Sequence, residues 1–375
     1  MSPGSVTRRP ARSEREATAR LESGPMETAA ARPRRSFDAG GETLDEVGEA
    51  ELLRRLTGAA LRSGGGTGLM VASGDDAAVW SPPAGAGVVL SQDAIVEGED
   101  FLKEWTDPES VGRRALAAAL SDLAAMGAQP QLCLVTLCAP GSAEVDDLLA
   151  VQEGVCAAAV EAGCRVAGGD VSAIGGPMVV DVAVVGTVDA RRVLRRDRGR
   201  PGDALVVTGN LGGAAAGLQI LLDGVKVAGE PAERCLSRQL HPRARLAEGQ
   251  ALAGLGVECA GDLSDGLIVD VGRIIEASGC GAQLWLDSIP AEPGIRALLG
   301  AGWVRAALGG GEDFELVAAV APDRLDGLLA AWPAELEPLT VVGRLDSGSG
   351  LRLLDARGGT PVPLPAVVSR HFGQP

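Results

Sequence analysis

Short acidic motifs recur along the chain, and carboxylates in this pattern could gather divalent cations. The motifs are SGDDAAV, LSQDAIVEGEDF, ALSDLAAMGA, AGGDVS, AGDLSDGL and GGGEDFEL, which carry Asp75, Asp76, Asp93, Asp122, Asp170, Asp262, Asp265, Glu312 and Asp313. Most of their neighbours are apolar, and a bare carboxylate is costly there unless a cation or a donor accompanies it. Mg²⁺ takes oxygen ligands and bridges to phosphates. Such a set would suit phosphoryl transfer, which depends on positioning and charge neutralisation and needs no protein nucleophile.

Simpler roles exist for most of these acids. Gly-Asp and Asp-Gly pairs are common in turns. Asp262 and Asp265, with Ser264 between them, could cap the helix that follows, although a helix N-terminus can also receive a phosphate. Asp122 lies inside a predicted helix among Leu and Ala residues. A turn role is therefore excluded for Asp122, and a solvated helix face remains the alternative.

Other nucleotide and cation motifs are absent or incomplete. A P-loop requires Gly-Lys, but Lys103 and Lys226 follow Leu and Val. The segment TGNLGGAAAG looks like a phosphate-cradling turn but lacks the GxGxxG spacing, and close packing would explain its glycines equally well. An EF-hand starting at Asp262 is excluded, because its twelfth position is Arg273 rather than Glu.

The elements expected around these motifs alternate between helices and strands. Helices are predicted at 46–63, 108–127, 142–162, 213–223, 243–254 and 266–278, the last of them ending at Gly279. Strands are predicted from 88 onward and at 131–139, 164–167, 178–188, 204–208, 283–286, 314–320 and 339–344. This order indicates an α/β (α+β) protein with a mixed sheet.

The chain is long enough for two domains with sizeable cores. Residues 1–45 lack hydrophobic periodicity and an apolar signal core, so we expect a disordered N-terminal extension. An Arg-rich stretch that ends at Asp203 is typical of a boundary. We therefore expect an N-terminal ATP- and metal-binding domain at 46–195 and a C-terminal α/β domain at 196–375.

Composition narrows the class of protein. The formal charge is −16, from 50 acidic and 34 basic residues, which argues against a nucleic-acid partner. No run of about 18 apolar residues is free of charge, so no membrane span is expected. The seven Cys form no CxxC pair, and there are two His, His241 and His371. Zinc sites and His-based catalysis are therefore not expected, whereas buried reduced thiols and a cytoplasmic location are.

In this order, the motifs resemble those of the thiamine-monophosphate kinase family. The resemblance runs from about Glu49 to Gly373 and rests on LSDLAAMGA, GGD, RPGD, DLSDGL, GGEDFEL and the closing HFG. It implies an N-terminal α/β domain that pairs its sheets in a homodimer, with a C-terminal α/β domain beside it. It also implies Mg²⁺-dependent, direct in-line transfer of the γ-phosphoryl group of ATP to thiamine monophosphate, with no covalent nucleophile.

The resemblance also implies roles for particular residues. The metal-associated positions are Asp75, Ser91, Gln92, Asp93, Asp122, Asp170, Asp262 and Asp265. The positions that contact ATP are Gly169, Asp170, Arg196 and Ser264, and those on the side of the acceptor substrate are Asp100, Glu312 and Ser369.

The sequence departs from the family pattern mainly on the acceptor side. The family's Ser-Thr-Asp reads Ser91-Gln92-Asp93, Asp100 replaces a substrate-side His, and Ser369 stands in a segment where an aromatic residue is expected before the final His-Phe. Two alternatives to the kinase above therefore remain open. One is a related kinase acting on another small phosphorylated acceptor, and the other is a nucleotide-binding protein without turnover.

Overall fold

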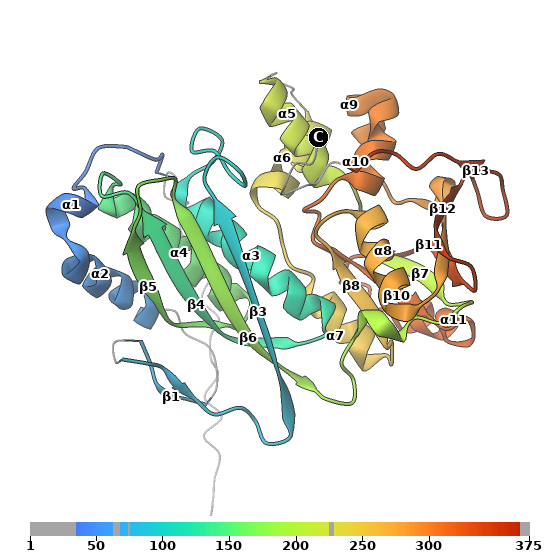
Figure 1. Ribbon diagram of the computed structural model, residues 1–375, viewed down its shortest axis with the longest axis horizontal. Helices are drawn as coiled ribbons and strands as arrows, with labels where there is room; N and C mark the ends of the chain where they lie inside the picture. The colour runs from blue at the N-terminus through green and yellow to red at the C-terminus, as the bar shows by residue number, and fades with distance from the viewer. Residues whose placement is uncertain (1–34, 63–67, 74–75, 225–228, 368–375) are drawn as a thin grey trace, which may run out of the picture. The chain divides into compact units, whose positions relative to one another are not determined.

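The computed structural model describes residues 35–62, 68–73, 76–224 and 229–367 of the 375-residue chain. The residues described from Arg35 onward belong to one compact unit. This unit contains two mixed sheets with helices packed against them (Figure 1).

The first sheet has four strands in the order β3-β6-β4-β5. They are β3 (Ala86–Val96), β4 (Gln129–Ala139), β5 (Arg165–Ala173) and β6 (Val179–Asp189). β5 runs parallel to β4, and the other pairs are antiparallel. Helices α3 (Pro108–Ala125) and α4 (Val145–Glu161) cover one face of this sheet (Figure 1). We call the opposite face, with exposed Val88, Leu90 and Leu134, the open face.

Helix α3 is buried on nearly every side. It begins with Asp107, whose carboxylate accepts the Ser110 amide at 2.9 Å, and Pro108 occupies its first turn. Most of its buried side chains belong to the core of the four-stranded sheet, whereas Ala124 and Ala125 belong to a core cluster of the second sheet. A helix that is buried on nearly every side is typical of such a position between two layers.

The second sheet has seven strands in the order β13-β12-β9-β11-β7-β10-β8. They are β7 (Ala204–Thr208), β8 (Cys259–Leu263), β9 (Gly281–Trp285), β10 (Glu315–Val320), β11 (Leu339–Asp346), β12 (Gly350–Leu354) and β13 (Pro361–Val362). The β9–β12 pair is parallel and the rest are antiparallel. Side chains that alternate along β7 enter two clusters, Leu205 and Val207 in one and Val206 in the other.

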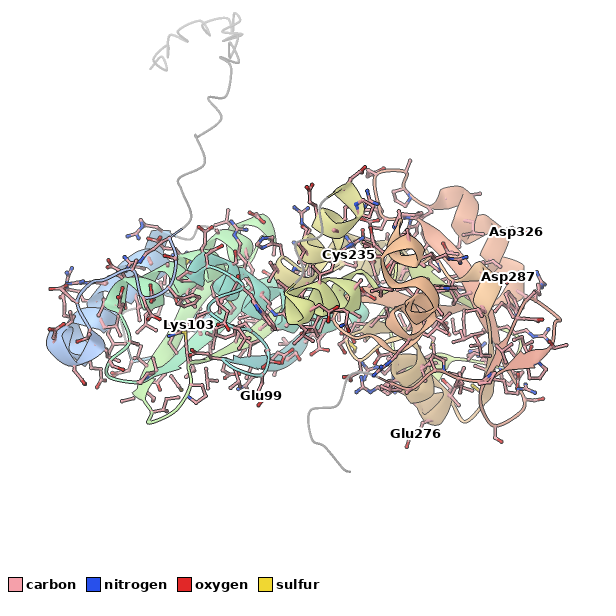
Figure 2. The ribbon with its side chains drawn as sticks, turned by 90° about the horizontal axis from the view of Figure 1, so that it is seen from above. Glu99, Lys103, Cys235, Glu276, Asp287 and Asp326 are labelled. Carbon is pink, nitrogen blue, oxygen red and sulfur yellow. The ribbon has the colours of Figure 1, made fainter. Side chains whose placement is uncertain are left out.

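Helices cover both faces of this second sheet. The cluster that contains Leu205 is shared with α8 (Leu267–Ser278) and α10 (Trp303–Gly309), and the cluster that contains Val206 with α7 (Leu246–Gly254) and α11 (Pro322–Ala331). A third cluster joins α5 (Gly213–Asp223), α6 (Glu230–Leu240) and α9 (Ile295–Leu299), with Cys235 buried in it. Cys235 is labelled in Figure 2.

The expected α/β (α+β) class with mixed sheets is confirmed. The predicted helix at 46–63 is divided, because Gly48 with a φ of 77° separates α1 (Leu44–Val47) from α2 (Glu49–Arg62). The sequence did not predict β1 (Leu69–Val71), β2 (Val79–Trp80), β8, β12, β13, α6, α9, α10 or α11.

Residues 35–45, which the sequence placed in a disordered extension, are packed against the start of α4 and the core of the first sheet. Phe37 is 8% exposed, and the Arg35 guanidinium lies 2.7 Å from the Glu144 carboxylate. The packed part of the chain therefore starts earlier than expected, because an apolar anchor and an ion pair hold a segment whose composition alone gave no helix or strand.

All seven Cys are free thiols, six of them buried. This agrees with the expected reduced state. Among the described residues, no helix is long and apolar enough to cross a membrane.

Candidate functional site

Strand β3 and helix α3 bring three of the expected residues together. Burial alternates along β3, so Ser91 and Asp93 face α3 while Leu90 and Gln92 face away from it. The Ser91 hydroxyl donates a short hydrogen bond to the Asp122 carboxylate. Asp122 therefore does not stand on a solvated helix face, because it contacts the covered side of the first sheet.

The second sheet adds Asp262 to this group. Asp262 lies on β8 and is 2% exposed. One of its oxygens accepts the Ser121 hydroxyl of α3 at 3.0 Å, and the other pairs with the Arg196 guanidinium at 3.2 Å. Because Ser121 precedes Asp122 directly, α3 holds carboxylates from both sheets near each other. We use the name carboxylate group for this cluster of four residues, which consists of the three acids Asp93, Asp122 and Asp262 together with Ser91, whose hydroxyl binds Asp122.

The carboxylate group carries more negative charge than its protein neighbours neutralise. Burial, followed by the charges of Asp122, Asp100 and Asp262, raises the pKa of Asp93 to about 6. Burial and then the charge of Asp122 raise the pKa of Asp262, against the opposing effect of Ser121 and Arg196. Buried carboxylates that repel one another in this way favour either protons or a cation.

The donor set fits magnesium by its chemistry. It consists of carboxylate and hydroxyl oxygens, which are the ligands that Mg²⁺ prefers. Within the described ranges, no three His, Cys, Asp or Glu side chains already stand close enough to hold an ion. The fit therefore lies in the oxygen donors and in the uncompensated charge.

Two loops lie against each other beside the carboxylate group. The Glu312 amide donates to the Ser264 carbonyl at 2.8 Å, and the Phe314 amide donates to the Leu263 carbonyl at 3.1 Å. Glu312 and Phe314 have φ values of 67° and 49°, a region that L-residues rarely adopt. The expected ATP contact Ser264 and the expected acceptor contact Glu312 are thus neighbours.

Asp265 lies in the same region but already has a cationic partner. Its carboxylate forms a short ion pair with Arg273, which also binds Asp270 at 2.6 Å. Burial, then the charge of Asp262, raises the pKa of Asp270 to about 7. Sequence reasoning missed Asp270, although an acid on the apolar helix that follows DLSDGL was a visible signal.

The open face of the first sheet carries the other expected residues. The Gln92 amide donates to Asp181 at 2.6 Å, on the side of β3 that faces away from α3. Asp170 lies on β5, at the opposite sheet edge from β3, and its register partner is Thr136. The structure therefore does not bring Gln92 or Asp170 to the carboxylate group within one chain.

Strand packing alone explains why position 169 is a glycine. A Cβ atom at this position would lie 1.8 Å from the Val135 carbonyl oxygen of β4, so the two strand backbones approach too closely for a side chain. Asp75 and Ser369, expected at the metal and acceptor sides, lie outside the described residues, as does His371.

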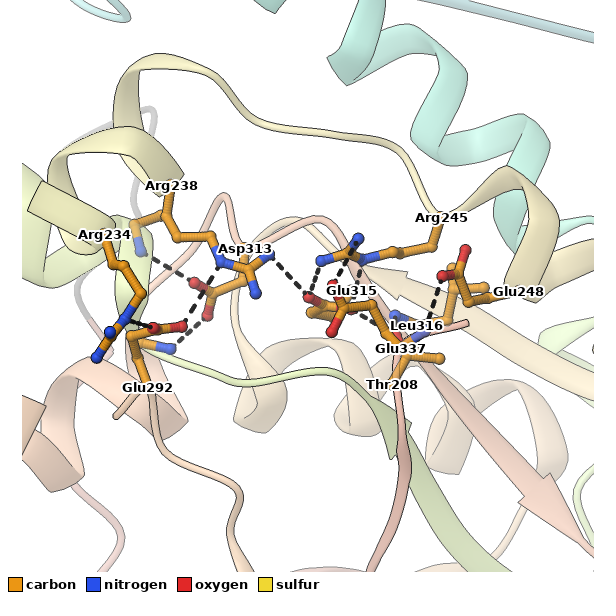
Figure 3. Close-up of polar contacts among 12 residues, drawn as sticks. Thr208, Arg234, Arg238, Arg245, Glu248, Glu292, Asp313, Glu315, Leu316 and Glu337 are labelled. Carbon is orange, nitrogen blue, oxygen red and sulfur yellow. Dashed lines mark hydrogen bonds and ion pairs between the residues drawn. The ribbon is translucent and has the colours of Figure 1, made fainter. Parts of the chain in front are cut away.

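The Gly-rich turn before α5 binds a carboxylate of the chain itself. Asp313 accepts the amides of Gly212 at 2.6 Å and Ala214 at 3.1 Å (Figure 3). Nearby, the fully buried Glu315 accepts Arg245 and the Thr208 hydroxyl, each at 2.7 Å (Figure 3). The turn is thus part of a buried ion-pair network, which favours the packing role for its glycines over a phosphate cradle.

Asp100 lines a pocket next to the carboxylate group. Its carboxylate accepts the Val96 amide at 2.7 Å. The lining of this pocket also includes Phe101, Trp105, Arg114 and Gln239. The residues that line this pocket thus include an acid, two aromatic rings and a cation.

Known proteins match both halves of the chain. The N-terminal domain of the AIR synthase related protein family matches residues 74–188, and its C-terminal domain matches residues 200–355. The thiamine-monophosphate kinase of Salmonella typhimurium is 37% identical over 308 residues, which cover 80% of this chain and 92% of that protein. That of Bacillus subtilis is 31% identical over 275 residues, covering 73% and 84%.

Solved structures of thiamine-monophosphate kinases also match this chain. The crystal structure of thiamine-monophosphate kinase from Stenotrophomonas maltophilia superposes with a TM-score of 0.72 at 34% identity, covering 80% of this chain and 95% of that one. AaThiL complexed with AMPPCP and TMP gives 0.66 at 27% identity, covering 83% and 95%. The hydrogenase maturation protein HypE in complex with ATP gives 0.70 at 20% identity, covering 85% and 96%, and shares the fold.

Proposed function

Because the chain belongs to the thiamine-monophosphate kinase family, we propose that it transfers the γ-phosphoryl group of ATP to the phosphate of thiamine monophosphate, giving thiamine diphosphate. The observation that carries the proposal is the carboxylate group between the two sheets, with Arg196 and Ser264 beside it. Transfer would be direct and in line, without a covalent nucleophile.

In this proposal Asp93, Asp122 and Asp262 would hold Mg²⁺, with Ser91 as a hydroxyl ligand. Asp75 and Asp265 join this set by family resemblance. The bound cations would supply charge neutralisation for the phosphates. Asp265 would release Arg273 if it became a ligand, since the two now form an ion pair.

Arg196 and Ser264 would contact the ATP phosphates. Arg196 already pairs with Asp262, so a phosphate could share its guanidinium. Ser264 lies at the start of the turn into α8, where the first amides of the helix favour an anion. Glu312 and Asp100 would face the acceptor, whose thiazolium ring is cationic and suits carboxylates.

We also propose a homodimer that pairs the open faces of two four-stranded sheets. Val88, Leu90 and Leu134 are 48%, 72% and 43% exposed on that face, which is unusual for large apolar side chains gathered on one surface. In such a dimer Asp170 of one copy would face the other copy, with Gly169 directly before it on β5, so their ATP role would belong to the assembled site. The free thiols support a reducing, cytoplasmic location.

A second acceptor is favoured by one observation. Asp100 replaces a family His, and its charge contributes to the raised pKa of Asp93. A carboxylate there repels an anionic phosphate and attracts a cation, so a different small phosphorylated acceptor remains the competing proposal.

The test is a product assay. Purified protein with ATP and Mg²⁺ is offered thiamine monophosphate, pyridoxal phosphate and similar phosphorylated acceptors in separate reactions, and products are separated by chromatography. We expect thiamine diphosphate and ADP in equal amounts. Turnover of another acceptor alone would support the competing proposal, and ATP binding without any product would support a nucleotide-binding protein without turnover.

A further inference from the structure

Arg114 is a buried cation that reaches from α3 toward the second sheet. Its side chain is 6% exposed. One guanidinium nitrogen donates a short hydrogen bond to the Gln239 carbonyl at the end of α6, and another lies 2.6 Å from Glu312 Oε1. A buried Arg is retained at a cost unless its partners are well placed, and both partners here come from outside its own sheet.

Glu312 is held at both of its carboxylate oxygens. Arg114 binds Oε1, and the Gln239 side-chain amide donates to Oε2 at 3.3 Å. The backbone of Glu312 has a φ of 67° and is fixed by its bond to Ser264. The carboxylate thus has a set position although its side chain remains 35% exposed.

Helix α3 connects this contact to the carboxylate group. Arg114 precedes Ser121 by seven positions, which is two helical turns and about 10 Å along the axis, so both side chains lie on the same side of α3. Ser121 binds Asp262, and Asp122 binds Ser91. A single rigid helix therefore fixes the spacing between Glu312 and the carboxylates that would hold the cations.

Both partners of Glu312 also line the pocket that contains Asp100 and Trp105. Glu312 does not line the pocket itself, but its carboxylate binds both Arg114 and Gln239. The cavity between these residues is only about 10 Å³, about the space of one water molecule, so a ligand would have to move their side chains apart before it met the aromatic ring, the acid and the edge of the Glu312 contact. That chemistry suits a flat, cationic heterocycle.

We propose that Arg114 is a positioning residue for the acceptor: it fixes the Glu312 carboxylate so that a bound cationic heterocycle presents its phosphate at the distance from the carboxylate group that α3 sets. The inference rests on the proposed function. Arg114 acts through Glu312 and contacts neither ATP nor the cations in this scheme.

The test separates acceptor positioning from general stability. Arg114→Met is expected to raise the KM for thiamine monophosphate about 10-fold or more, as for a lost charged hydrogen bond, with the KM for ATP changed less than about 2-fold. Arg114→Lys should recover part of the loss, because the charge returns without the paired geometry. The matched control is Arg113→Met, since Arg113 is the adjacent residue and pairs on the surface with Glu109 and Glu161.

A milder variant keeps the test usable if Arg114→Met does not fold. Gln239→Leu removes only the donor to Oε2, and we expect the same selective rise in acceptor KM, smaller in size. In a Glu312→Ala background, Arg114→Lys should have no further effect on that KM, because its target is gone.

Some results would contradict the inference. Equal changes in the KM values of ATP and acceptor, or lower thermal stability with unchanged KM values, would leave Arg114 a purely structural residue. An active wild type with these results overturns only the role of Arg114. A wild type that forms no thiamine diphosphate overturns the proposed function and this role with it.

Discussion

Asp122 interrupts an alanine- and leucine-rich helix with a charge, and its carboxylate accepts the Ser91 hydroxyl from the neighbouring sheet. Its charge contributes to the raised pKa values of both Asp93 and Asp262. Asp122 is therefore the acid that couples the two sheets' carboxylates electrostatically.

Asp122→Asn is expected to lower kcat about 100-fold or more, because it removes a carboxylate that would hold the cations, and the cations would neutralise the phosphates in the transition state. ADP release with thiamine monophosphate measures this. The control is Asp326→Asn, an exposed acid of α11 that is labelled in Figure 2 and should leave kcat unchanged. Equal rates for wild type and Asp122→Asn would remove Asp122 from the proposed site.

Asp313 gives a prediction about pH. Burial raises its pKa to about 7 from 3.8, so the folded chain holds the proton more tightly than the unfolded chain. The free energy of unfolding should therefore fall as the pH rises from about 4 to about 7. Asp313→Asn removes this contribution, and its stability relative to wild type should improve as the pH rises through that window.

Urea unfolding at several pH values checks this expectation for Asp313. The exposed Asp287, also labelled in Figure 2, supplies the control variant Asp287→Asn, whose difference from wild type should not vary with pH. A constant difference for Asp313→Asn as well would show that the buried carboxylate does not titrate in this range.

At the scale of elements, α3 and α4 pack with almost no space between their backbones. A Cβ atom on Gly112 of α3 would lie 1.9 Å from the Val151 carbonyl oxygen of α4. Gly272 of α8, by contrast, has no atom within 4 Å of the same position. One helical glycine is thus required by packing and the other is not.

Gly112→Ala should therefore destabilise the protein by about 1–3 kcal/mol, because the helices must separate. Gly272→Ala should stabilise it by about 0.5–1 kcal/mol through its helix propensity. Denaturant unfolding of the two variants measures both signs. A destabilising effect of the same size at both positions would mean that α3 and α4 are not in the close contact described here.

Most strands and long helices could be predicted from the sequence, since alternation and glycine stops mark them. Helix α6 could not be predicted, because its Pro-Ala-Glu-Arg stretch carries few apolar residues. Those few are buried only by packing against α5 and α9. Arg114 was missed for a related reason: it stands beside Arg113 in the sequence, and only the packing of α3 against the second sheet decides which of the two is buried.

The face of a strand is equally hard to predict from motifs. Ser91, Gln92 and Asp93 are consecutive, so a motif groups them, but the pleat sends Gln92 to the open face. Asp170 shares that face on another strand. The roles that the family motifs give these residues therefore stay predictions, and their division between the two sides of the sheet required the structure.

At the scale of the whole molecule, the open face is the surface that a second copy would cover. We expect sedimentation to give a dimer, and Leu90→Lys to weaken it about 10-fold or more by placing a charge in the interface. Leu222→Lys is the matched control, since Leu222 is 62% exposed on α5, away from the sheet. A wild type that is monomeric at micromolar concentration would contradict the proposed dimer.

The position of helix α3 between the two cores determines when its backbone amides become exposed to water. Its first turns lie in the core of the four-stranded sheet, and its last alanines lie in a core of the seven-stranded sheet. Its Arg114 and Ser121 side chains also bind Glu312 and Asp262, which belong to the loop before strand β10 and to the second sheet. Its backbone amide protons can then reach water only when both cores loosen together. In deuterium exchange, α3 should therefore be among the last helices to take up label, and its rate should report the opening of the entire compact unit.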